Sequence, residues 1–274
     1  MNHFLAIMAD ALTTSLCVVA IDLVLGYMNR YYFAFVAQML CGAFSTFLFM
    51  RGQLALGTGY AVAILAIGAA AAYGLTRLDS ESFAIFSLAQ VLLAYYITIS
   101  LDGTGSIYGL DLHLALSSSV RYVLSIGAAF LFLGGLAYVR LLNVAVAAKA
   151  FGDSARLSRC LAPLHTKCVA VVILTLSVVA AAAGILVSFC ASRLDASFFS
   201  ADESFWMLML LIVGGRCSLK GALVAPALAV LVRLGLETLI NKPAIVNIMI
   251  AAVVIAFLIK RPTGIWGEAL YDRE

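Results

Sequence analysis

143-NVAVAAKAFGDSARLSRCLAPLHTK-167 is the one long polar and basic stretch of an otherwise very apolar chain. Against a single acid, Asp153, it carries the basic residues Lys149, Arg156, Arg159, His165 and Lys167. Uncharged runs flank it at 122–139 and 168–192, and each is long enough or nearly long enough to cross a bilayer. A basic loop between two membrane spans is typical of the cytoplasmic side. The stretch therefore predicts a polytopic membrane protein with this loop inside.

The polar stretch has a helical composition of its own. Residues 145–161 are rich in Ala, Leu, Arg and Lys, their one helix breaker is Gly152, and Pro163 follows them. We expect a short helix that lies along the inner membrane face, where a soluble partner could push on it. The alternative interpretation is a solvated basic loop beside anionic lipid.

The composition of the whole chain also indicates a membrane protein. Hydrophobic residues make up 64% of the sequence, charged residues 11%, and the mean hydropathy is +1.09, values that predict an integral membrane protein in a lipid bilayer. We expect an all-α, polytopic fold in which residues 1–274 form a single transmembrane domain. The net charge of +3 fits loops on the inner side and gives no reason to expect a nucleic-acid partner. Six scattered cysteines without a C-x-x-C pair predict no metal site.

Apolar runs separated by charged or glycine-rich turns predict about eight or nine transmembrane segments, with the C-terminus inside. A break within the membrane is expected near residues 27–32, and residues 204–213 are too short to span comfortably. The expected segments are 4–27, 31–50, 52–76, 83–100, 122–142, 168–192, 204–213, 221–240 and 244–259.

Polar side chains inside these segments are candidates for the substrate path, because such groups are costly in a membrane. The candidates are Asp22, Asn29, Gln38 and Gln90. Asp22 could instead pair with Arg30 or cap a broken helix, and each amide could form an ordinary interhelical hydrogen bond. We expect Asp10 to meet water at the membrane edge.

Several motifs resemble those of the branched-chain amino-acid ABC importer permeases, the LivH and LivM type. The similarity covers nearly the whole chain. The matching segments are Leu25-Gly26-Tyr27 with Gly42-Ala43-Phe44, residues 83–89 (FAIFSLA), the run from Gly214-Gly215 through Ser218 to Gly221, and residues 261–267 (RPTGIWG). By this resemblance we expect structural turns at Gly42, Gly214, Gly215 and Gly221. Cys217 replaces the third glycine of that turn, and Ala34-Phe35 replaces a Gly-His pair.

The resemblance implies a coupling helix at about residues 148–163 that docks on a cytoplasmic ATPase, through Lys149, Asp153, Arg156, Arg159 and Pro163. The chain has no G-x-x-x-x-G-K-[ST] phosphate cradle, so it would bind no cofactor, and ATP and Mg would bind to separate ABC ATPase subunits. The other implied partners are a second permease subunit, identical or related, and an extracytoplasmic solute-binding protein. The implied location is the inner membrane.

The function expected from these features is a non-catalytic permease that moves a small solute, with a branched-chain amino acid as the first choice. A sugar or nucleoside is the alternative solute, because FGDSARLS resembles permeases of related importers. An ion-coupled secondary transporter is a rival class, since it too would use Asp22 and broken helices. An enzyme is disfavoured because the chain has no G-x-S-x-G motif and its three histidines lie at ends or in loops.

Overall fold

The structure is a computed structural model, and it describes residues 2–101, 110–111, 118–141, 162–190, 193–240, 243–261 and 264–266. Within these residues the chain forms helices almost throughout, together with one antiparallel pair of two-residue strands. The helices are α1 (Asn2–Met28), α2 (Phe35–Met50), α3 (Leu54–Arg77), α4 (Ser80–Ser100), α5 (Ser118–Leu141), α8 (Ala162–Cys190), η2 (Ala196–Phe199), α9 (Ala201–Gly214), α10 (Leu219–Ile240) and α11 (Pro243–Lys260); the strands are β1 (Leu110–Asp111) and β2 (Arg193–Leu194).

Six of the described helices are long and apolar enough to cross a membrane, namely those that contain Phe4–Gly26, Leu54–Arg77, Ser80–Ser100, Ser119–Leu136, Ala170–Cys190 and Leu219–Leu236. Two shorter apolar helical segments, Phe35–Met50 and Ile248–Phe257, accompany them. Helices satisfy their own backbone hydrogen bonds, which is what a membrane span requires. The all-α, polytopic fold predicted from the sequence is therefore confirmed.

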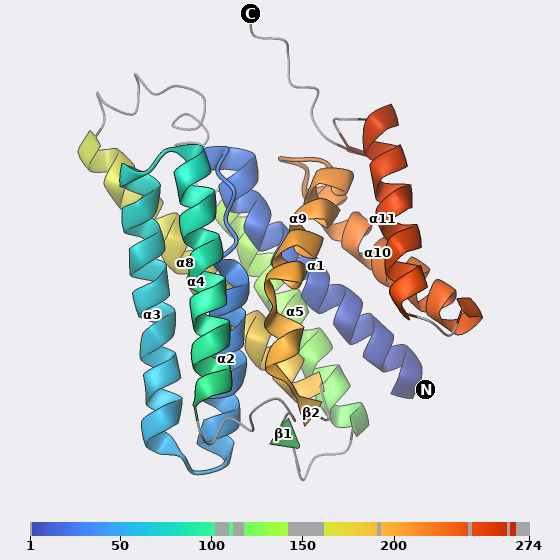
Figure 1. The fold of residues 1–274 in the computed structure, drawn as a ribbon, viewed down its shortest axis with the longest axis horizontal. Coiled ribbons are helices and arrows are strands. Elements are labelled where there is room, and N and C mark those ends of the chain that lie inside the picture. The colour runs from blue at the N-terminus through green and yellow to red at the C-terminus, as the bar shows by residue number, and fades with distance from the viewer. Residues whose placement is uncertain are drawn as a thin grey trace, which may run out of the picture.

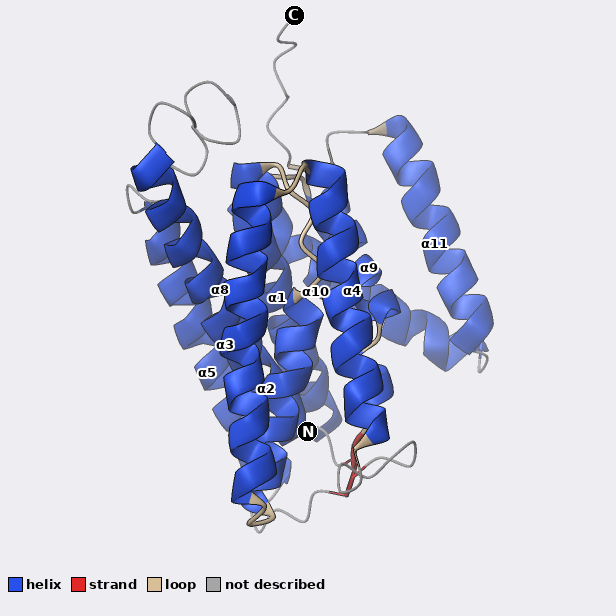
Figure 2. Cartoon of the chain, turned by 60° about the vertical axis from the view of Figure 1, so that its left-hand side comes forward, coloured by secondary structure: helices blue, strands red, loops and turns tan. Residues whose placement is uncertain are grey.

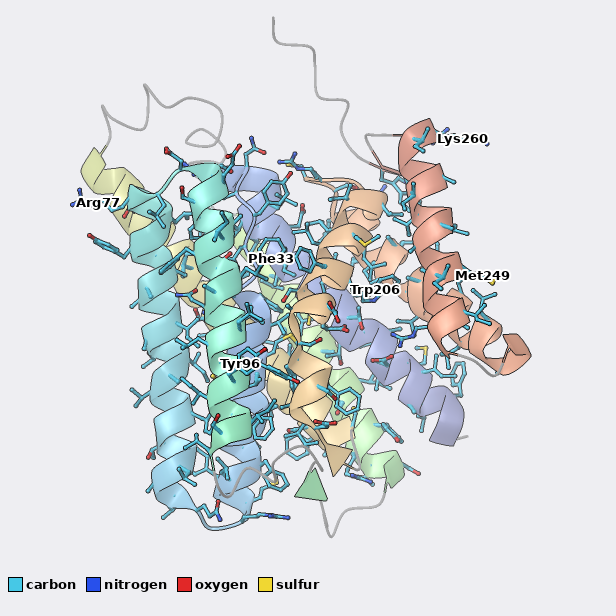
Figure 3. All side chains as sticks on the ribbon, in the orientation of Figure 1. Phe33, Arg77, Tyr96, Trp206, Met249 and Lys260 are labelled. Carbon is cyan, nitrogen blue, oxygen red and sulfur yellow. The ribbon has the colours of Figure 1, made fainter. Side chains whose placement is uncertain are left out.

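Different segments of the chain lie at the two ends of the bundle. Arg77 and Lys260 lie at one end (Figure 3), and the α9–α10 turn and the start of α8 lie at this same end (Figure 1). The N-terminus and the β1–β2 pair lie toward the opposite end. The loop between α5 and α8 lies outside the described residues, so its cytoplasmic location stays a prediction.

The core is built around α1 and α2. Helix α1 contacts α5, α8, α9 and α10, while α2 lies between α3 and α8. At the α2–α8 contact, a Cβ on Gly42 would collide with the backbone of Ala181, and one on Gly184 with the backbone of Met39. The expected turn at Gly42 is thus wrong: this glycine lies inside α2, where its missing side chain permits close helix packing.

Exposed helices lie on several sides of this core. Helices α3 and α4 stand side by side in both views, and α11 stands on the other side, next to α10 (Figures 1 and 2). Large apolar side chains project outward from α3, α4 and α11, which is expected of surfaces in a bilayer. They include Val62, Leu65, Ile85, Leu93, Ile248 and Val253.

Candidate functional site

Irregular backbone interrupts the helices inside the bundle, between α1 and α2. Residues 29–34 are not helical, yet Tyr32 and Ala34 are fully buried. Here the Phe33 N–H donates to Ser87 Oγ on α4 at 3.2 Å, and Ser204 Oγ on α9 donates to the Phe33 carbonyl at 3.5 Å. Non-helical backbone is tolerated at membrane depth only where protein or water surrounds it. The sequence placed this break at residues 27–32, two residues too early.

Two buried polar atoms beside the break have no hydrogen bond within the described residues: the Tyr32 hydroxyl and Gln38 Oε1. Gln38 is 0% exposed, and its Nε2 donates to Ser177 Oγ on α8 at 2.8 Å. The Tyr32 hydroxyl faces the Gln38 side chain, but the geometry between them does not close a hydrogen bond. The Tyr32 ring stacks on Phe83 of α4 at 6.1 Å, which keeps the hydroxyl in place.

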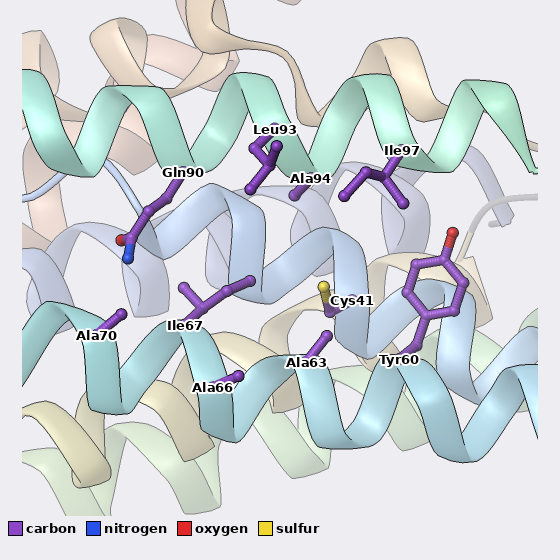
Figure 4. A pocket seen from close by; sticks show the side chains of 10 residues that line it. All are labelled: Cys41, Tyr60, Ala63, Ala66, Ile67, Ala70, Gln90, Leu93, Ala94 and Ile97. Carbon is purple, nitrogen blue, oxygen red and sulfur yellow. The ribbon is translucent and has the colours of Figure 1, made fainter.

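A third unpaired atom lies at a neighbouring cavity between α2, α3 and α4 (Figure 4). The cavity measures about 290 Å³, and Gln90 extends into it from α4. Gln90 Oε1 is buried without a hydrogen-bond partner in the part of the chain that the structure describes. The other lining residues are apolar or aromatic, apart from the Cys41 thiol: Cys41, Tyr60, Ala63, Ala66, Ile67, Ala70, Leu93, Ala94 and Ile97.

These three unpaired atoms all belong to uncharged hydrogen-bonding groups around α2–α4. One hydroxyl and two amide oxygens are uncharged groups that donate or accept hydrogen bonds. A buried polar atom without a partner costs about 1–3 kcal/mol, and water or a ligand removes that cost. The region is therefore suited to hydrogen-bonding a polar solute or ordered water, and among the sequence-predicted path residues it contains Gln38 and Gln90.

Asp22 and Asn29 belong to a different structure, a junction between the end of α1 and the α9–α10 turn. Asp22 is fully buried, and its Oδ1 accepts from the Cys217 N–H at 3.0 Å. Arg216 donates to the Leu25 carbonyl at 3.0 Å and to Asn29 Oδ1. The structure thus brings Asp22 and Asn29 together at the junction, away from Gln38 and Gln90.

The neighbouring arginine has its own contact. Arg30, considered from the sequence as an ion-pair partner of Asp22, donates to the Leu78 carbonyl at 3.1 Å. This hydrogen bond ties the start of the break to the turn between α3 and α4.

The α9–α10 turn has tight backbone geometry. Gly215 has a φ of 102° and Cys217 a φ of 61°, in the left-handed region that favours glycine. Cys217 Sγ donates to the Gly26 carbonyl at 2.9 Å. A side chain on Gly214 would collide with the backbone of Gly221, so these glycines permit the close start of α10. The positive φ at Cys217 explains why glycine suits this position in the resembling permeases.

A short segment after α11 completes the junction. The Ile265 N–H donates to the Val213 carbonyl at 2.9 Å, and the Trp266 N–H donates to the Gly214 carbonyl at 3.1 Å. A Cβ on Gly264 would meet Gly215. Three parts of the chain that are distant in sequence thus meet at the C-terminal end of α9.

Sequence reasoning missed a charged cluster on α1, α9 and α10: Asp10, Asp202, Glu203 and Arg233. Glu203 is partly buried and interacts electrostatically with Arg233 first, then with Asp10 and Asp202. At 1.5 Å per residue, Asp10 lies about 18 Å along α1 from Asp22, and Arg233 about 21 Å along α10 from Leu219. Asp10, Asp202 and Arg233 are exposed on the surface of the described structure.

The prediction that Asp10 meets water at the membrane edge stays a prediction: Asp10 is exposed, and it lies near the other charged side chains of this cluster. The signal was present in the sequence. Asp10 and Arg233 interrupt long apolar runs, and a charge in such a run indicates a partner or a polar cavity. Arg233 stabilises the Glu203 carboxylate, whereas Asp10 and Asp202 repel it.

Most of the predicted ATPase-coupling residues, namely Lys149, Asp153, Arg156 and Arg159, lie outside the described residues. Pro163 is the second residue of α8, a position that a proline tolerates because the first N–H groups of a helix have no intrahelical acceptor. Among the residues that the structure places, no group of three or more His, Cys, Asp or Glu side chains could hold a metal ion.

Comparison with known proteins gives one finding. A family model described as "Branched-chain amino acid transport system / permease component" matches residues 3–258. Neither the curated proteins nor the solved structures contain a match to the chain. The matched range contains α1 to α10 and most of α11.

Proposed function

The chain belongs to the family of permease components of branched-chain amino acid transport systems, and from this premise we propose that it is the transmembrane subunit of an ABC importer for a branched-chain amino acid. The resemblance seen in the sequence is thereby confirmed at the level of the family, and the chain is a multi-pass membrane transport protein. The observation that carries the proposal is the family match over residues 3–258, joined to six helices that can cross a membrane.

The energy source in this proposal is a separate chain. The sequence has no phosphate-binding loop, so ATP and Mg bind to two ABC ATPase subunits, and this subunit is not catalytic. In this proposal Lys149, Arg156 and Arg159, which lie outside the described residues, meet the ATPase. Closure of the nucleotide-bound ATPases shifts the equilibrium between outward-open and inward-open states, because the two states contact the ATPases differently.

The solute enters from an extracytoplasmic binding protein and passes between two permease subunits in the inner membrane. The unpaired atoms of Tyr32, Gln38 and Gln90 suit a solute without net charge, such as a zwitterionic amino acid, because uncharged groups bind it without the desolvation cost of a fixed charge. The apolar walls around Gln90 suit a branched aliphatic side chain. These features support an amino acid over a sugar, whose several hydroxyl groups would need more polar partners.

Reconstitution tests the proposal. The purified chain is placed in proteoliposomes with the ATPase and solute-binding protein that co-purify with it, and uptake of labelled leucine is measured with and without ATP. We expect ATP-dependent uptake that requires all components. Uptake by the chain alone under a proton or sodium gradient would establish a secondary transporter instead. Uptake of ribose in preference to leucine would reject the amino-acid assignment and leave the ABC assignment intact.

A further inference from the structure

The cavity between α2, α3 and α4 has one polar end and one apolar end (Figure 4). Gln90 and Ala70 lie at the polar end, and Tyr60 and Ile97 lie at the other. The Tyr60 hydroxyl already donates to Thr98 Oγ1 at 3.0 Å, so this far end offers a solute mainly carbon atoms. A molecule with a polar head group and an aliphatic tail therefore fits the cavity in one orientation.

The wall that α3 contributes to the cavity is made of small side chains. The cavity-lining residues of this helix are Ala63, Ala66, Ile67 and Ala70. Their spacing of i, i+3, i+4 and i+7 places them on one face of the helix, and at 1.5 Å per residue the first and last are about 10 Å apart along its axis. The cavity of about 290 Å³ depends on these alanines, because a longer side chain at any of the three positions would project into it.

The polar end of the cavity matches the head group of an amino acid. The Gln90 side chain carries a donor, Nε2, and an acceptor, Oε1, and the acceptor is buried without a partner in the described residues. The ammonium group of a zwitterionic amino acid can donate to this oxygen, and its carboxylate can accept from the amide nitrogen. With the head group at Gln90, the aliphatic side chain of the solute lies along the alanine-lined wall toward Tyr60.

We propose that the alanine stripe on α3, formed by Ala63, Ala66 and Ala70, determines which aliphatic side chain the permease accepts, while Gln90 holds the head group. The transmembrane subunit thereby selects its solute by size, in addition to any selection by the solute-binding protein. One methylene group in an apolar pocket changes selectivity by about 10- to 200-fold, so leucine and valine are distinguishable in this way. This inference rests on the proposed function and assigns roles within the same site.

Filling the cavity tests the role of the alanine stripe. Ala66→Leu lengthens a side chain of the cavity wall, and Ala69→Leu is the matched control, because Ala69 does not line the cavity. Both alanines are exposed on α3, so the two variants carry a similar risk of misfolding. In proteoliposomes with the partner ATPase and solute-binding protein, we expect the ratio of leucine to valine uptake to fall about 10-fold in Ala66→Leu and to stay unchanged in Ala69→Leu.

The ratio of the two uptake rates is the quantity to measure. The same solute-binding protein is present in every sample, so its own preference cancels between variants. An unchanged ratio in Ala66→Leu, or an equal fall in both variants, rejects size selection by the alanine stripe.

Reopening the filled cavity tests the same point in the other direction. Leu93 lines the cavity from α4 and is 63% exposed, so its truncation removes little packing. Leu93→Ala added to Ala66→Leu should restore most of the lost ratio, and a rescue of this kind cannot arise from misfolding. Leu92→Ala, at the neighbouring exposed position that does not line the cavity, should restore nothing. Rescue by both truncations or by neither contradicts the proposal.

The role of Gln90 is tested by a change that keeps a similar side-chain volume. Gln90→Leu removes the hydrogen bonds to the head group, which leucine and valine share. We expect uptake of both solutes to fall by the same factor, about 10-fold, with an unchanged ratio. Undiminished uptake, or a changed ratio, rejects the assignment of Gln90 to the head group.

The proposed function and this inference fail separately. If ATP-driven leucine uptake is observed but Ala66→Leu behaves as Ala69→Leu does, only the size selection is wrong. If an ion gradient drives uptake without an ATPase and Ala66→Leu still lowers the leucine-to-valine ratio, the ABC assignment is wrong and the size selection stands.

Discussion

Two regions of the bundle gather polar side chains, and the two regions differ in charge and in how their polar atoms are paired. On α1, α9 and α10 the groups are charged and of both signs, with Glu203 near Arg233, Asp10 and Asp202. Around α2, α3 and α4 they are uncharged, and three of their atoms, on Tyr32, Gln38 and Gln90, lack partners in the described structure. In the charged region Arg233 offsets part of the charge of three carboxylates, whereas the three uncharged atoms have no hydrogen-bond partner in the described structure.

This difference indicates what each region is for. Charges in a membrane are retained only when they are compensated, and a compensated cluster holds helices together. Unpaired polar atoms lower stability, and native structures contain few of them. A group of them beside a helix break indicates a place where water or a ligand supplies the missing hydrogen bonds. We therefore expect substitutions in the first region to reduce stability and substitutions in the second to reduce transport.

The largest effect is expected where the charged cluster loses its cation. Arg233→Ala leaves Glu203, Asp10 and Asp202 together without a positive charge. We expect a loss of about 2–3 kcal/mol in unfolding free energy, less than the 3–5 kcal/mol of a fully buried pair, because Arg233 is exposed. Thermal unfolding in detergent measures this loss. Adding Glu203→Gln to Arg233→Ala should recover part of it, and a double variant less stable than Arg233→Ala would contradict electrostatic compensation.

A smaller effect is expected at the junction where the end of α1 meets the α9–α10 turn. Cys217 has a positive φ, so Cys217→Val places a β-branched residue in the left-handed region. We expect a destabilisation of about 1–2 kcal/mol from backbone strain, measured by the same thermal unfolding. Cys217→Gly is the matched control, since it relieves the strain. If valine and glycine had equal effects, the turn geometry described here would be wrong.

The substitution Gln38→Leu should reduce transport without reducing stability. It removes an amide oxygen that has no partner in the described structure, together with one hydrogen bond to Ser177. We expect ATP-driven uptake to fall about 10-fold, the value of one hydrogen bond to the solute of about 1.4 kcal/mol, while the melting temperature changes little. Ser177→Ala is the control, because it removes the same hydrogen bond but keeps the Gln38 oxygen. An equal loss of uptake in both variants would mean that the Gln38–Ser177 contact matters rather than the free oxygen.

The sequence predicted the helices better than it predicted their contacts. Apolar run length is a local property, so the spans and the break before α2 follow from it within a few residues. The partner of Asp22 could not be found in this way, because Cys217 is distant in sequence and the turn that holds it forms only when α9 and α10 pack on α1. Gly42 is a similar case: the motif identified it, but its role depends on α8. Gln90 could be named as a polar residue in an apolar helix, yet only the structure shows that its oxygen is unpaired.

A pair of tyrosines gives the smallest and most direct test, because the same chemical change is made in a paired and an unpaired hydroxyl. The Tyr60 hydroxyl donates to Thr98, so Tyr60→Phe should lower the unfolding free energy by about 1 kcal/mol, the net value of one hydrogen bond. The Tyr32 hydroxyl has no partner within the described residues, so Tyr32→Phe should leave stability unchanged or raise it slightly, while uptake falls a few-fold. Both rings keep their packing, which confines the difference to the oxygen atom. If Tyr32→Phe destabilised the chain as much as Tyr60→Phe, its hydroxyl would have a partner in the membrane, and the uncharged region would be as well compensated as the charged one.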